Sequence, residues 1–270
     1  MTAMRFNGWR DGLSYGLMGL PLAFVALPLY VILPNHYARE FGVPLASLGA
    51  ILLGARLFDA FIDPLLGRWS DHLFAKSSQA VLAFGAVAAI LLAAGFTGLF
   101  FPMTKDAQGL LVWASALLVV TYAAYSAVSV AHQSWGAMLG GDEAQRSRIV
   151  AWREGLGLLG VLMASMAPVV LGLPATVALF GVALVAGWLA WTRAARPRTS
   201  PTFKTHALGL PFERPAFRRL LLVFMLNGIA SAIPATLILF FVQDRLQVPQ
   251  AMEPVFLGSY FLCAALEIPL

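Results

Sequence analysis

The chain has 270 residues, of which 60% are hydrophobic and only 11% are charged, and its formal net charge is +5. Its mean hydropathy is +0.79. The polar side chains are too few to cover the surface of a soluble protein of this length. The composition therefore excludes a soluble globule and indicates a membrane protein.

Long apolar segments follow one another along the whole chain. The first is long enough to cross a hydrocarbon layer of about 30 Å and too long for an ordinary signal-peptide core. The short alternating segments of an outer-membrane barrel are not seen, so we predict an all-α polytopic protein. Its eight expected spans are 13–34, 45–68, 80–101, 110–138, 149–171, 174–192, 219–242 and 255–270.

One polar stretch, 193–219, divides these spans because it carries seven bases, one acid and four prolines. We predict a six-helix bundle over 1–192, a cytoplasmic linker over 193–219, and the first two helices of an incomplete second bundle over 220–270. "IPATLILFFVQDRLQVP" (233–249) is similar to "LPLYVILPNHYAREFGVP" (27–44). This similarity suggests parallel repeats of six helices, as in secondary transporters with two halves. Either the chain is then a fragment of a twelve-helix protein or the repeat interpretation is wrong.

The basic residues indicate an orientation. With Arg56 set aside, only Arg39, Lys105 and Arg245 of the 18 Lys and Arg residues fall on the side opposite the N-terminus. Because Lys and Arg favour the cytoplasmic side, we expect a cytoplasmic N-terminus in a plasma membrane, such as a bacterial inner membrane. The positive charge then faces anionic lipid, and no nucleic-acid partner is needed. We expect a monomer in the lipid bilayer.

Three charged residues interrupt the second span, in "ARLFDAFIDPLLGRWSDH" (55–72). Arg56, Asp59 and Asp63 fall within an arc of about 100° on one helix face. A charge facing lipid at mid-bilayer costs about 2.5–3.5 kcal/mol, so this face is expected to look toward protein or a water-filled cavity. Arg56 can neutralise one carboxylate, and a monovalent cation or a proton would neutralise the other. A network that only packs two helices together is the alternative.

The same stretch resembles the second-helix signature of the glycoside-pentoside-hexuronide (GPH):cation symporters, the melibiose-permease-like branch of the major facilitator superfamily. "SYGLMGLPLAFVALPLY", "WGAMLGGDEAQRSRIVAWREG" and "RRLLLVFMLNGIASAIPATLILFF" are also similar to this family. The resemblance covers nearly the whole chain and implies a fold of twelve helices, of which this sequence would hold the first two-thirds.

The resemblance implies which residues bind the coupling ion. Asp59 and Asp63 would bind a cation, and Ser126 on the fourth helix would supply a hydroxyl ligand. Ile62 replaces the asparagine of sodium-using relatives and offers no oxygen, so we expect a proton, or a promiscuous site, rather than strict sodium coupling. No further cofactor and no metal beyond a possible sodium at the two aspartates are expected.

The resemblance says less about the substrate. Ala23 and Ser129 stand where galactoside-transporting relatives carry acids, and Arg153 matches the family's fifth-helix arginine near the sugar, although it could also be a basic residue at the helix flank. His132 and Gln133 are further candidates for substrate contact, although a lone histidine more often bonds a backbone carbonyl.

"GRWSDHLFAK" (67–76) resembles the superfamily's loop between the second and third helices, where Gly67 and Asp71 match the pattern. A carboxylate in the last span, Glu267, is expected to face a cavity or a helix interface.

We therefore predict a symporter, coupled to protons or sodium, that moves a small sugar or sugar-like solute by alternating access. A lipid or amphiphile carrier of the same superfamily and a non-transporting membrane scaffold are the alternatives. No P-loop, metal-ligand spacing or nucleophile motif occurs, so an enzyme is not expected.

Overall fold

The computed structural model describes residues 8–197, 210–249 and 252–266, and within these ranges it is helical and has no strand. Six of its helical segments are long and apolar enough to cross a membrane. They match the first six predicted spans, each with at least one longer end, although the third and fifth end one residue earlier than predicted: Trp9–Glu40, Leu45–Lys76, Ser78–Phe100, Ala107–Met138, Glu143–Val170 and Leu173–Arg193.

The first of these spans is built from several pieces, whereas the next five are single helices. It comprises α1 (Trp9–Gly16), α2 (Gly19–Leu27), the π-helical turn η1 (Pro28–Ile32) and α3 (Leu33–Glu40). The following spans are α4 (Leu45–Lys76), α5 (Ser78–Phe100), α6 (Ala107–Met138), α7 (Glu143–Val170) and α8 (Leu173–Arg193). In η1 the N–H of Leu33 reaches back five residues to the carbonyl of Pro28.

Beyond the linker, the chain continues in η2 (Leu210–Glu213), α9 (Pro215–Phe240), the π-helical turn η3 (Phe241–Arg245) and α10 (Glu253–Leu266). Helix α9 therefore begins inside the stretch predicted as linker, with Pro215 in its first turn, where a missing N–H costs nothing. Helix α10 covers most of the eighth predicted span, and Glu267 lies outside the described residues.

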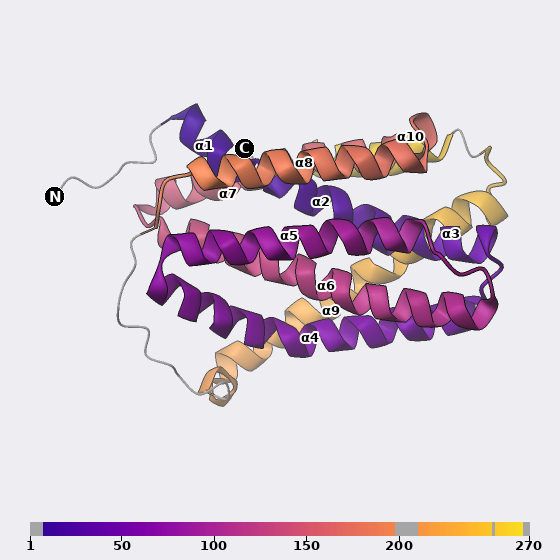
Figure 1. Ribbon diagram of the computed structural model, residues 1–270, viewed down its shortest axis with the longest axis horizontal. Helices are drawn as coiled ribbons and strands as arrows, with labels where there is room; N and C mark the ends of the chain where they lie inside the picture. The colour runs from indigo at the N-terminus through magenta and orange to yellow at the C-terminus, as the bar shows by residue number, and fades with distance from the viewer. Residues whose placement is uncertain (1–7, 198–209, 250–251, 267–270) are drawn as a thin grey trace.

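The helices run back and forth between two ends of the molecule, along the horizontal direction of Figure 1. One end, here the Trp9 end, holds the start of the first span and the α4–α5 and α6–α7 connections. The other, the Arg39 end, holds the end of the first span and the α5–α6, α7–α8 and η3–α10 connections. Helix α2 packs along α7, and α6 packs between α4 and α5.

Side-chain caps fix several helix starts. Asp106 accepts a hydrogen bond from Gly109 N at 2.7 Å, Asp142 accepts one from Gln145 N at 2.8 Å, and both carboxylates sit at a helix N-terminus that favours negative charge.

Ser77 caps α5 in the same way, through a 3.1 Å bond from Ala80 N. It is also the whole connection between α4 and α5. Gly67 and Asp71, predicted to lie in a loop, are therefore placed in the last turns of α4, because no residue between them and Ser77 breaks a helix.

Glycines bring the first span and α7 into backbone contact. A Cβ on Gly19 would lie 2.5 Å from the carbonyl oxygen of Arg153, and one on Gly16 would lie 2.7 Å from that of Trp152. On α7, a Cβ on Gly160 would overlap the backbone of Leu20. Small residues are what allow such close packing of membrane helices.

The segments 27–44 and 233–249, similar in sequence, also end in the same geometry. Each has one residue with positive φ in front of its Val-Pro pair: Gly42 at 63° and Gln247 at 52°. Gln247 is the only non-glycine residue of the described chain with positive φ.

The hydrogen bonds that close these two helix ends are equivalent as well. Val43 donates its N–H to the carbonyl of Tyr37 at 3.2 Å, and Val248 donates to the carbonyl of Val242 at 3.3 Å. Each bond spans six residues and encloses the left-handed residue of its segment. The similarity of the segments 27–44 and 233–249 in sequence therefore extends to the backbone at their ends.

Among the side chains of α9 that the structure describes, the buried ones lie near the Arg39 end. There Leu239 is 3% exposed and Val242 in η3 is 1% exposed, whereas Leu222 and Phe224, further toward the Trp9 end, are 57% and 68% exposed. Helix α9 contacts η1 and α3, and α10 packs on α7. The described part of the second half therefore meets the first six helices mainly at the Arg39 end (Figure 1).

Candidate functional site

Asp59 lies on the face of α4 that packs along α6. Its Oδ1 accepts a hydrogen bond of 2.8 Å from Oγ of Ser126, which is only 5% exposed. The structure thus brings together the first aspartate and the hydroxyl that the family resemblance assigns to the ion site. This pair places a negative oxygen and a neutral oxygen side by side between two helices.

Asp63, one turn further along α4, is half-buried. Its Oδ1 is buried and has no hydrogen-bond partner in the described structure. A buried carboxylate oxygen without a donor is unfavourable, and the penalty disappears when it takes up a proton or contacts a cation. The unpartnered oxygen of Asp63 and the Asp59–Ser126 pair are both able to contact a cation or to take up a proton.

Arg56 forms no ion pair with either aspartate among the described contacts. Its guanidinium carbon instead lies 3.7 Å from the ring centroid of Tyr30 and 5.5 Å from that of Tyr122. The expected direct neutralisation of a carboxylate by Arg56 is therefore replaced by a cation–π contact, since two aromatic rings lie within reach of the same side chain.

All five predicted substrate residues line one cavity of about 130 Å³ between the first span, α6 and α7. These are Ala23 from α2, Ser129, His132 and Gln133 from α6, and Arg153 from α7. The other residues that line it are Gly19, Leu22, Tyr125, Glu154 and Gly157. Its walls combine small residues with hydroxyl, amide, carboxylate and guanidinium groups.

The polar groups of this cavity form two pairs, one on α6 and one on α7. Gln133 Nε2 donates to Ser129 Oγ at 3.2 Å, and Arg153 pairs with Glu154 beside it. Because Arg153 lies ten residues inside α7, it borders the cavity and not the helix end. Arginine, glutamine and serine are the donor types that suit a hydroxylated solute.

His132 differs from the other four because it is fully buried. Its Nε2 lies 2.8 Å from the backbone oxygen of Tyr15, its ring stacks on the Tyr15 ring at 4.4 Å, and Tyr15 Oη donates to the His132 carbonyl at 3.2 Å. These contacts tie the first span to α6. They are the contacts of a histidine bonded to a backbone carbonyl, the alternative considered for this residue.

Sequence reasoning did not identify three tyrosines of this region. Tyr122 and Tyr30 surround Arg56, and Tyr125 lines the cavity. A signal for Tyr122 was available, since it shares one face of a helix with Ser126 and Ser129 at spacings of four and three residues. Tyr30 had none, because its direction depends on the π-helical turn.

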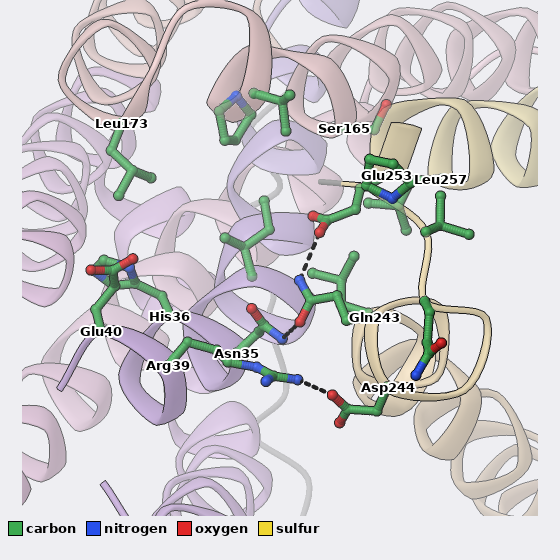
Figure 2. Close-up of a pocket in the computed structure, with 17 residues that line it drawn as sticks. Asn35, His36, Arg39, Glu40, Ser165, Leu173, Gln243, Asp244, Glu253 and Leu257 are labelled. Carbon is green, nitrogen blue, oxygen red and sulfur yellow. Dashed lines mark hydrogen bonds and ion pairs between the residues drawn. The ribbon is translucent and has the colours of Figure 1, made fainter. Parts of the chain in front are cut away.

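A second, larger cavity of about 710 Å³ lies at the Arg39 end, between the first span, α7, η3 and α10. A chain of hydrogen bonds crosses it (Figure 2): Asn35 donates to Gln243 at 2.9 Å, and Gln243 donates to the buried Glu253 at 2.7 Å. Arg39 forms an exposed ion pair with Asp244 beside this chain. These bonds join the first half to the described part of the second.

Comparison with known proteins places the chain in a family. The sequence pattern of a family described as MFS/sugar transport protein matches residues 14–270. The chain belongs to this family. Its resemblance to GPH-type symporters and its all-α membrane fold are therefore confirmed, and the family consists of transporters and not enzymes.

Curated relatives of the chain are bacterial proteins. It is 24% identical to the "Putative glycoside/cation symporter YagG" of Escherichia coli (strain K12), over 58% of this chain and 34% of that protein. It is 28% identical to the "Isoprimeverose transporter" of Lactiplantibacillus pentosus, over 58% and 33%. It is 23% identical to the "Inner membrane symporter YicJ" of E. coli (strain K12), over 58% and 34%.

The matched part of the chain spans about a third of the length of these relatives. No solved structure matches the chain.

Proposed function

We propose that this member of the MFS/sugar transport family is a cation-coupled symporter of a sugar or sugar-like solute, with its ion site at Asp59, Asp63 and Ser126. The observation that carries the proposal is the 2.8 Å bond between Ser126 and Asp59, one turn from a buried and unpartnered oxygen of Asp63. Intramembrane carboxylates are costly, and their retention is best explained by ion binding.

The solute site in this proposal is the cavity lined by Ala23, Ser129, Gln133 and Arg153. It is close to the ion site along α6, since Ser126 and Ser129 are one helical turn apart. Ion binding at one serine can therefore influence the solute site at the other. The names of two relatives refer to a glycoside and to isoprimeverose, which supports a sugar-like solute.

The coupling ion in this proposal is a proton in preference to strict sodium. The oxygen-bearing side chains placed at the site come from Asp59, Asp63 and Ser126, and Ile62 adds none. A proton needs one carboxylate, whereas a sodium ion requires several oxygen ligands.

We infer an inner-membrane location with a cytoplasmic N-terminus. The basic residues of the chain favour this orientation, and one relative is named an inner membrane symporter. The Trp9 end then faces the cytoplasm. Contact between the described parts of the two halves at the Arg39 end supports a state of the alternating-access cycle that is closed to the outside.

The test is uptake of radiolabelled glycosides and pentosides by cells that express the full-length gene, with and without sodium and a proton gradient. Asp59→Asn and Asp63→Asn are each expected to abolish accumulation against a gradient. Glu143→Gln, an exposed carboxylate at the start of α7, is the matched control and is expected to behave like the native protein. Accumulation that survives both aspartate substitutions would overturn the proposed ion site.

A further inference from the structure

We propose that Tyr30 and Tyr122 are positioning residues that hold Arg56 away from Asp59 and Asp63, and that they thereby set the apparent affinity for the coupling cation. The inference rests on the ion site proposed above. It assigns a role to two side chains outside that site, which act through the guanidinium of Arg56.

The geometry shows where Arg56 is held. Its guanidinium carbon is 3.7 Å from the ring centroid of Tyr30 and 5.5 Å from that of Tyr122. The two rings lie 5.8 Å apart with their planes at 53°, so the guanidinium contacts a cradle formed by both. A guanidinium within about 6 Å of an aromatic centroid is attracted by the ring.

Both tyrosines are placed by features of the helices that carry them. Tyr122 is 1% exposed and lies on α6, one turn before Ser126. Tyr30 lies in η1, where the backbone bond from Leu33 to Pro28 spans five residues and not four. Such a π-helical turn changes the direction of the side chains that lie in it and after it, and such turns are common at functional sites.

The aspartates are the competing partners of Arg56. Asp59 lies three residues further along the same face of α4, within reach of a long and flexible side chain, and Asp63 follows one turn later. A guanidinium paired with a carboxylate would occupy the position that a coupling cation needs. The rings reduce this competition, so their hold on Arg56 adds to the affinity for the external cation.

The experiment measures cation binding without transport. Purified full-length protein in detergent is melted at increasing NaCl concentrations at pH 8, and at decreasing pH without sodium. A cation that binds only the folded protein stabilises it by RT ln(1 + [cation]/Kd), so the rise of the melting temperature with cation concentration gives Kd, which is the half-saturating concentration or pH.

Tyr30→Leu removes the ring, and Tyr30→Phe keeps it as the matched control. For the cation that stabilises the native protein, we expect Leu to weaken apparent binding about tenfold and Phe to change it less than about twofold. For a proton, a tenfold weakening moves the half-saturating pH down by about one unit. Adding Arg56→Gln to Tyr30→Leu removes the competitor and is expected to restore the native value.

Two results would overturn the inference: a folded Tyr30→Leu protein that binds the cation as tightly as the native one, or a Phe variant as weak as the Leu variant. If Tyr30→Leu does not fold, Arg56→Lys decides, because an ammonium keeps the charge but holds an aromatic cradle less well and should also weaken binding. Failure of the proposed function differs from both, since the native protein and Asp59→Asn would then show the same cation response.

Discussion

Gly160→Ala probes the close packing of the first span against α7. A Cβ at this position would lie 2.9 Å from the carbonyl carbon of Leu20 and 3.1 Å from its Cα, with the carbonyl oxygen closer still. Carbon atoms pack best at about 3.5–4.0 Å, so the two helices must separate by several tenths of an ångström or more. Overpacking of this kind costs about 1–3 kcal/mol.

Gly155→Ala is the matched control, since a Cβ there meets no atom within 4 Å on the same helix. Both substitutions gain the same helix propensity, about 0.5–1 kcal/mol, so the difference between the two variants isolates the steric cost. At about 3 °C per kcal/mol, the Gly160 variant should melt roughly 6 °C below the Gly155 variant in detergent. Equal melting temperatures would refute the backbone contact between α2 and α7.

Three further predictions concern other parts of the chain. Ser126→Ala removes the hydroxyl donor to Asp59 and is expected to weaken sodium binding but to strengthen proton binding, each by about tenfold, because a carboxylate that loses a donor is protonated more easily; identical titrations for Ala and the native protein would contradict this. Arg39→Asp and Asp244→Arg should each slow uptake by up to about fivefold, as suits an exposed ion pair, and the double charge swap should recover it; a swap no faster than the single variants would contradict the pairing. Gln247→Gly places a residue that tolerates positive φ at this position and should raise the free energy of unfolding by about 0.5–1 kcal/mol in thermal melts. A lower melting temperature would count against the observed backbone.

The sequence predicted the first six spans well, and the reasons are physical. Apolar length is a direct requirement of the bilayer, so each long segment was recognisable without knowledge of its neighbours. The placement of Asp59 opposite Ser126 followed from family resemblance, because nothing local in α4 specifies its partner helix. The cavity residues of α6 shared a helix face, and the structure brings them together as that spacing predicts.

Contacts that depend on a bent backbone could not be predicted. Arg56 lies on Tyr30 because η1 carries an extra residue in its turn, and no pattern around Pro28 specifies that turn. The loop prediction for Gly67 and Asp71 was wrong for a different reason. The residues up to Lys76 continue a helix as readily as they form a loop.

The ion pair at the Arg39 end joins equivalent positions of two similar segments, 27–44 and 233–249. Arg39 and Asp244 occupy equivalent positions in front of the two left-handed helix caps, so the halves meet there through corresponding residues. Two identical halves would have faced each residue with a copy of itself, arginine against arginine or aspartate against aspartate. The ion pair at this position therefore depends on the difference in sequence between the two segments, which places an arginine in one and an aspartate at the equivalent position of the other.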